Sequence, residues 1–181
     1  MSTLLPARPL PVPRPSHKWQ AFASECWQVH HLQPTPDSVR VTPGSEGLTV
    51  VIGDGPESQP WCTTVLLAAD GSVSVQTAAS PPGVLMTSRE VRMVPGGPGG
   101  VGRARLDVGD RLLIMSAEAL GALPEALGAM RRSTTPTVNT ASPGDLLRRL
   151  LHDLPIGAAA IAVRTSPTRS ASGPGAEART R

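Results

Sequence analysis

The sequence predicts an α+β domain built from antiparallel β-sheet layers with helices packed on one face. Three observations lead to this fold class. Between Val39 and Val94 the chain runs through short alternating stretches of apolar and polar residues, separated by turn residues, as in β-hairpins. Two segments with helical patterns follow, and a last apolar run, Ala158–Val163, ends the folded part. Hairpins followed by helices and one strand indicate segregated layers rather than the strand–helix alternation of a parallel sheet.

The two termini have compositions that do not build a core. Residues 1–15 place five prolines among few helix or strand formers and are expected to form a disordered, extended arm. Residues 165–181 are small, polar and basic, and we expect a disordered tail there. Residues 16–164 remain for the folded domain, which is enough chain for one hydrophobic core.

Composition and charge narrow the class of protein. Aromatic residues make up 2% of the 181 residues, so Leu, Val, Ile, Ala and Met must fill the core. Lys18 is the only lysine, and the many Ala, Gly, Pro and Arg residues are typical of a GC-rich bacterial genome. The net charge is +3, but the arginines are scattered and do not interleave with aromatics. We therefore expect no nucleic-acid partner.

Membrane and secretion signals are missing from the sequence. Prolines interrupt every apolar run in residues 1–30, so a signal peptide is not expected. No apolar stretch approaches the roughly 20 residues that span a bilayer. Cys26 and Cys62 lack metal-ligand spacing and are expected to be free thiols. A cytoplasmic protein without membrane contact is the expectation.

The first folded segment, Trp19–Leu32, fits two structures. A short helix would place its two tryptophans, Ala23, Cys26 and His30 on one face. Alternatively, the second half, Cys26–Leu32, alternates well enough to form a strand.

Strands and turns follow in a regular series. The apolar runs predict strands at Leu48–Ile52 and Trp61–Ala68, and the Asp70–Gly71 pair is the strongest hairpin signal in the chain. Ser72–Thr77 alternates as the returning strand, and Glu90–Val94 alternates again. The glycine-rich run that follows, residues 95–102, is expected to be a flexible loop.

The last third is expected to contain the helices. Arg111–Met115 is a fully apolar strand apart from its first residue, and Ala117–Met130 has high helix propensity with one interrupting proline. Residues 134–141 form a polar linker. A second helix starts with Ser142 as its N-cap and Pro143 in its first turn.

The segment Val108–Ser116 resembles a signature of PPM-type metal-dependent serine/threonine phosphatases, in the branch of stage II sporulation protein E. That branch has a Gly-Asp pair, an apolar strand, and then Thr or Ser followed by a metal-binding Asp and a Gly. Gly109, Asp110 and the strand up to Ser116 match this pattern. Ala117 stands where the metal-binding Asp belongs, and Glu118 stands where the Gly belongs.

A second part of the resemblance lies near the C-terminus. Ser142–Leu151 is similar to a helix that in this branch precedes a strand beginning Gly-Asp-Asp, and Gly157–Arg164 is similar to that strand. In the family this strand supplies another metal-binding Asp. Ala158 and Ala159 replace both aspartates.

The register of the Gly53-Asp54-Gly55 turn has two interpretations. It is similar to the family's Ala-Gly-His turn, in which case the N-terminal half of the family domain is absent. It is also similar to the family's early Gly-Asp loop, which would make Asp54 a metal ligand. The chain between Asp54 and Ser116 is short for the two long helices and further strands that the family places there.

The resemblance implies a pseudophosphatase, a regulatory protein that binds without catalysis. The family's reaction needs two divalent metals held by carboxylates, and an alanine methyl group supplies no ligand. No metal cofactor is therefore expected. Active members dephosphorylate antagonists of anti-sigma factors, which implies a bacterial partner-switching pathway. Part of a sandwich would expose an apolar sheet face, and we expect a protein partner or a homodimer to cover it.

Two other functions remain open from the sequence. One is a residual phosphatase that uses Mn²⁺ or Mg²⁺ with Asp54, Asp110 and Glu118 as makeshift ligands. The other is a decayed chain without a defined function or a stable fold.

Overall fold

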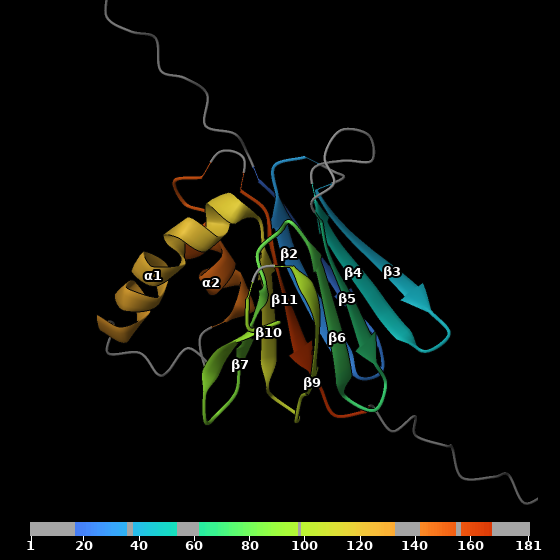
Figure 1. The fold of residues 1–181 in the computed structure, drawn as a ribbon. Helices are drawn as coiled ribbons and strands as arrows, with labels where there is room; N and C mark the ends of the chain where they lie inside the picture. The colour runs from blue at the N-terminus through green and yellow to red at the C-terminus, as the bar shows by residue number, and fades with distance from the viewer. Residues whose placement is uncertain are drawn as a thin grey trace, which may run out of the picture.

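The computed structural model describes residues 17–35, 38–53, 62–97, 99–132, 142–154 and 157–167. Within them the chain forms three layers: a pair of helices, a six-stranded sheet and a five-stranded sheet (Figure 1). The predicted arm 1–15, the linker 134–141, most of the predicted tail and Asp54 lie outside the described residues.

Both sheets are antiparallel throughout. The six-stranded sheet has the order β1 (Lys18–Ala23), β2 (Trp27–Gln33), β11 (Ala159–Arg164), β10 (Arg111–Met115), β7 (Gly83–Met86) and β8 (Val91–Val94). The five-stranded sheet has the order β3 (Val39–Gly44), β4 (Gly47–Gly53), β5 (Cys62–Ala68), β6 (Ser72–Ala78) and β9 (Gly100–Arg105).

The core lies between the inner faces of the two sheets. Because strand side chains alternate between the faces, every second residue of β4, β5 and β6 points inward. Val50, Val65 and Val75 are completely buried there, opposite Val29 and Ala160 of the six-stranded sheet. Aliphatic side chains thus fill an interior that has almost no aromatic residues.

The two helices cover the outer face of the six-stranded sheet. α2 (Pro143–Leu150) packs three buried leucines, Leu146, Leu147 and Leu150, against β2 and β11. Ser142 caps it, since its hydroxyl accepts the Asp145 N–H at 3.4 Å. α1 (Ala117–Arg132) follows β10 and packs beside α2. The predicted fold class, antiparallel layers with helices on one face, is confirmed.

The first segment forms a β-hairpin, so the helical interpretation of Trp19–Leu32 is wrong. A tight turn separates β1 from β2: the Ser24 N–H donates to the Trp27 carbonyl at 2.8 Å, and the Trp27 N–H donates to the Ser24 hydroxyl at 3.2 Å. The second half is the strand that the alternation of Cys26–Leu32 predicts, with Trp27, Val29 and His31 buried on one face.

The glycine-rich run is also more ordered than expected. Gly100–Gly102 begins β9, which pairs with β6. Glycine is required at position 102, because a Cβ there would lie 2.6 Å from Val94 and 2.8 Å from the Pro95 backbone. Close backbone approach, rather than flexibility, explains this glycine.

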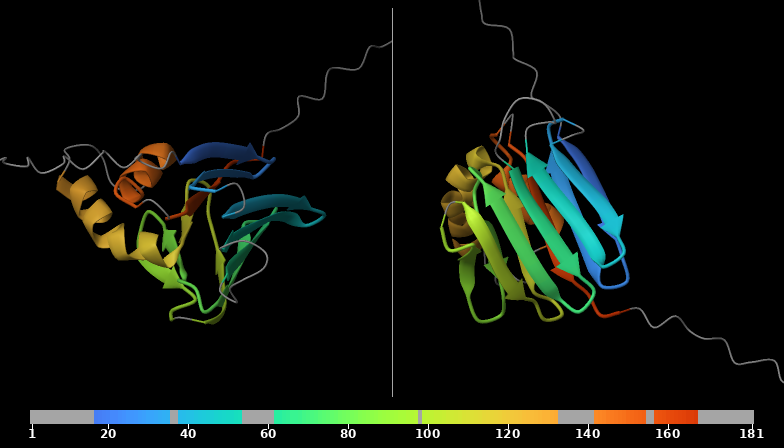
Figure 2. Two further views of the ribbon diagram at one scale, coloured as in Figure 1. Left: turned by 90° about the horizontal axis from the view of Figure 1, so that it is seen from above. Right: turned by 45° about the vertical axis from the view of Figure 1, so that its right-hand side comes forward.

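Among the described residues, no helix covers the outer face of the five-stranded sheet, which we call the uncovered face. The views in Figure 2 show both helices on the far side of the molecule from β3, β4, β5, β6 and β9. Because both sheets are present, their apolar inner faces cover each other. None of the described helices is long and apolar enough to cross a membrane.

Two adjacent histidines on β2 give a prediction about pH. Burial, and then the neighbouring Arg111, lower the pKa of His30, while burial, and then His30, lower the pKa of His31. A folded-state pKa below the unfolded value means that the unfolded chain binds more protons, so stability present above about pH 6.5 is lost as the pH falls.

We expect urea unfolding to show a lower stability at about pH 5.5 than at about pH 8. His31, the more buried of the two at 4% exposure, is the one to replace. The loss should shrink in His31→Gln and stay unchanged in the control His152→Gln, whose side chain is exposed. Equal losses in wild type and His31→Gln would contradict the assignment.

Candidate functional site

The end of β10 and the start of β11 are joined by hydrogen bonds. The Ser116 N–H donates to the Ala158 carbonyl at 2.9 Å, and the Ala158 N–H donates to the Ser116 hydroxyl oxygen at 3.2 Å. In the register of the two strands, Met115 lies opposite Ala159. Ala117 and Ala158, which are far apart in the sequence, therefore lie at one end of the sandwich, the upper end in Figure 1. We refer to it as the β10–β11 end.

The alanines at this end face different surroundings. Ala158 belongs to the core between the sheets, together with Ala160 and Ala162. Ala159 belongs to the cluster under the helices, beside Ile161. Because neighbouring side chains of a strand point to opposite faces, only position 158 of these two directs its side chain between the sheets. Ala117, the first residue of α1, is exposed.

Neutral polar side chains are buried at the same end. Gln33 accepts the N–H of Val39 at 2.7 Å and so joins β2 to β3. The Thr63 hydroxyl lies 2.8 Å from that of Ser80 and donates to the Pro81 carbonyl at 3.0 Å. These bonds tie the two sheets together. The side chains of Ser38, Thr77 and Ser116 are buried at this end too. We call these six side chains the neutral polar cluster.

This neutral polar cluster was not found by sequence reasoning. The sequence signal for this cluster is a polar residue at an inward position of a hairpin strand. Thr63, two residues before Val65, and Thr77, two residues after Val75, are such residues. Since Thr64 and Gln76 occupy the outward positions next to them, the signal appears only after the strand register is known.

The donors that the structure describes at the β10–β11 end do not fit a pair of divalent cations. Mg²⁺ and Mn²⁺ take carboxylate and other hard oxygen ligands, whereas methyl groups stand at 117 and 158. The hydroxyl of Ser116 is already bonded to the β11 backbone. Within the described residues, no three His, Cys, Asp or Glu side chains form a group that could hold a metal ion.

Two of the three makeshift ligands lie far apart. Glu118 is in the first turn of α1, where a carboxylate interacts favourably with the helix N-terminus. Asp110 comes directly before the first residue of β10. It therefore lies at the opposite end of this five-residue strand, roughly 17 Å from the β10–β11 end. Its carboxylate accepts the Asp107 N–H at 2.9 Å and closes a turn. Asp54, the third, lies outside the described residues.

Within the described ranges, the other reactive side chains do not assemble into a site. His152 and Asp153 are exposed and bond each other at 2.8 Å, whereas Ser116 is buried at the β10–β11 end. Cys26 and Cys62 are free thiols, as the sequence predicts. A hydrolase triad therefore finds no support in this arrangement.

Comparison with known proteins agrees with the geometry. No family model and no curated protein matches the chain. Among solved structures, the chain is similar to the phosphatase domain of the cell fate determinant SpoIIE from Bacillus subtilis, with a TM-score of 0.57 and 13% identity, over 88% of this chain and 99% of that one. It is also similar to RsbX in complex with magnesium, with a TM-score of 0.54 and 11% identity, over 82% of this chain and all of that one.

The chain therefore has a divergent PPM-type phosphatase fold, in the structural neighbourhood of SpoIIE and RsbX. At these identities the similarity concerns the fold. The pairing of β10 with β11 is the part of that fold which the sequence resemblance requires, and it is present.

Proposed function

We propose that this protein is a pseudophosphatase: a PPM-like domain that regulates by binding a protein partner and does not hydrolyse phosphate esters. The proposal rests on the fold and on the residues at the β10–β11 end. One observation carries it. Ala117 and Ala158 lie at the hydrogen-bonded ends of β10 and β11, where the resemblance places metal-binding aspartates.

Packing at this end supports the proposal. A mobile, solvated pocket would keep space for a substrate phosphate, whereas Ala158 and Ala159 are at most 2% exposed. The neutral polar cluster is satisfied largely by bonds to the backbone and to its own hydroxyls. These residues hold the two sheets together, and a binding protein needs such a stable sandwich as much as an enzyme does.

The pathway follows from the resemblance and from the SpoIIE neighbour. We propose a bacterial partner-switching pathway in which this domain binds an anti-sigma factor or its antagonist. Biosensor titration of the full chain against the proteins encoded beside its gene measures this. Saturable binding to one of them is the expected result, and uniform absence of binding would reject the pathway.

Catalysis is tested by hydrolysis of an aryl phosphate. We expect no increase in rate over buffer when Mn²⁺ is added, because the carboxylates that hold the metals are missing. A catalytic PPM phosphatase domain assayed in parallel is the positive control. Manganese-dependent turnover that disappears in Asp54→Ala would establish the residual phosphatase instead. A non-cooperative thermal transition of the same sample would favour the decayed chain.

A further inference from the structure

The strands of the uncovered face of the five-stranded sheet carry positive charge, and its carboxylates lie in the turns: Glu46, between β3 and β4, lines the groove described below, and Asp70 lies between β5 and β6. The five strands contain three arginines, Arg40, Arg103 and Arg105, and no carboxylate. All three arginines are exposed and stand at outward positions of the two edge strands, β3 and β9. Arg105 acts electrostatically on Asp70, whose pKa is lowered chiefly by hydrogen bonds from Ser72. Among the described residues, neither Arg40 nor Arg103 forms an ion pair.

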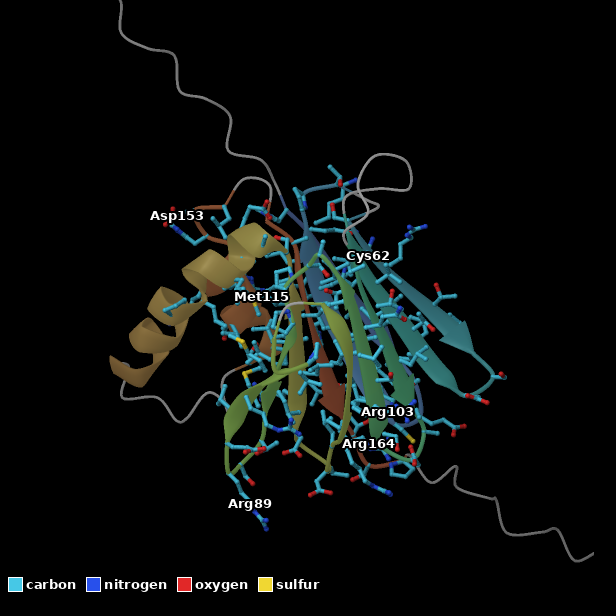
Figure 3. All side chains as sticks on the ribbon, in the orientation of Figure 1. Cys62, Arg89, Arg103, Met115, Asp153 and Arg164 are labelled. Atoms are coloured by element: carbon cyan, nitrogen blue, oxygen red, sulfur yellow. The ribbon has the colours of Figure 1, made fainter. Side chains whose placement is uncertain are left out.

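The middle of this face is apolar and hollow. Leu66 of the central strand β5 is 53% exposed, and Val101 of the edge strand β9 is 59% exposed. A groove of about 780 Å³ lies on this face, lined among others by Thr49, Leu66, Ser74, Arg103 and Glu46. Gly47 also lines the groove, and glycine is required there because a Cβ would overlap the Leu67 backbone of β5. The face thus combines an apolar centre, hydroxyl groups and arginines at both edges (Figure 3 labels Arg103).

The other sheet of the same molecule shows what such a face binds. There, α2 lays its leucines on β2 and β11 and turns Asp145 and Arg148 to solvent. Sheets of this kind are stable when a second layer covers them, and helices are one common covering. Within the described residues, no helix packs on β3, β4, β5, β6 or β9.

Charge decides between the candidate occupants. In a face-to-face dimer of this chain the arginine-bearing edges would meet arginine-bearing edges, and among the described residues that line the groove Glu46 alone offers a carboxylate, against three outward arginines. A partner with acidic side chains would instead place its carboxylates next to these arginines. The two edges are four strand spacings apart, roughly 19 Å, which corresponds to about 13 residues of helix.

We propose that the outer face of the five-stranded sheet docks an amphipathic helix of a protein partner, with an apolar stripe over Leu66 and carboxylates reaching Arg40 and Arg103. This inference rests on the proposed binding function and names its surface. The helix supplies to the five-stranded sheet the layer that α1 and α2 supply to the other sheet.

A peptide selection tests the surface without knowledge of the natural partner. A displayed library of random peptides of about 18 residues is selected on the immobilised full chain and counter-selected on Leu66→Glu. We expect enriched peptides with leucine-like residues at helical spacing and carboxylates towards both ends. Their affinity, by fluorescence polarisation, should fall at least about tenfold for Leu66→Glu and for Arg103→Glu. Arg89→Glu, an equal charge change at the tip of the β7–β8 hairpin (Figure 3), should leave it unchanged.

Several outcomes would overturn the inference. These are no enrichment, enrichment of basic or uncharged peptides, and equal binding to wild type and Leu66→Glu. A dimer in sedimentation that dissociates in Leu66→Glu would assign the face to a second copy, and single-stranded DNA binding lost in Arg103→Glu would assign it to nucleic acid. Circular dichroism and urea midpoints confirm that the variants fold, as expected for exposed positions.

The surface and the proposed function fail in different ways. If a natural partner protein binds wild type and Leu66→Glu equally well, this face is not the docking surface, while the binding function stands. If manganese-dependent hydrolysis is found and no partner binds, the proposed function itself fails.

Discussion

Ala158→Asp is expected to lower the free energy of unfolding by about 3 kcal/mol, because it places a carboxylate between the two sheets without a counter-charge. Ala158 is 2% exposed and lies among apolar residues of both sheets. The Ser116 hydroxyl beside it already accepts a hydrogen bond from the Ala158 N–H. Ala117→Asp, at an exposed position in the first turn of α1, should change stability by less than about 1 kcal/mol and in the favourable direction.

Urea unfolding of the full chain, without added metal, measures both effects. Ala158→Asn is the matched control, since it adds nearly the same volume without the charge. The difference between Ala158→Asp and Ala158→Asn then reports the buried charge alone. A loss below about 1 kcal/mol for Ala158→Asp would show that the site still accommodates a carboxylate.

The outcome bears directly on the proposed function. If the carboxylate is strongly destabilising, Ala158 is part of the core. The position at which the resemblance places a metal-binding Asp then serves the packing of the two sheets. If the carboxylate is tolerated, the β10–β11 end is a polar site from which a ligand is merely missing. The first result favours a domain maintained for its shape, and the second a recently inactivated enzyme.

Strands with a regular pattern could be predicted from the sequence, and irregular ones could not. β4, β5 and β6 alternate cleanly between core and solvent, and their turns carry strong signals. β1 is an edge strand with five of its six residues exposed, so burial leaves no period in it. β7 has only four residues, all buried, and a short apolar run has no period to read.

The candidate site was predictable only as far as the resemblance reached. The match at Ser116 and Gly157 implied that β10 and β11 are neighbours, which the register confirms. The different directions of Ala158 and Ala159 needed that register, because two adjacent residues look alike in a sequence. The neutral polar cluster depends on contacts between β2 and β3 and between β5 and the β6–β7 connection, which no local pattern contains.

At the opposite end of the sandwich, the side chain of one arginine links the two sheets. Arg164 of β11 is 9% exposed and lies with its guanidinium 5.3 Å from the ring centre of Trp27. It donates to the Cys26 carbonyl at 3.2 Å and to the Ala69 carbonyl, in the β5–β6 turn, at 2.8 Å. The Trp27 indole donates to the neighbouring Ala68 carbonyl at 2.8 Å. Together the two side chains fasten the five-stranded sheet to β2 and β11 at the lower end in Figure 3.

Arg164→Met should therefore lower the free energy of unfolding by about 3 kcal/mol, since methionine keeps the bulk but gives up the cation–π contact and both hydrogen bonds. Arg148→Met is the matched control. Arg148 also lies over a tryptophan, 5.6 Å from the Trp19 ring, and pairs with the Asp145 carboxylate, but its side chain is 65% exposed. In water such contacts contribute little, and we expect a change below about 1 kcal/mol. Equal losses from the two substitutions would mean that the sheets are held by their apolar faces alone, and that Arg164 only covers the end of the core.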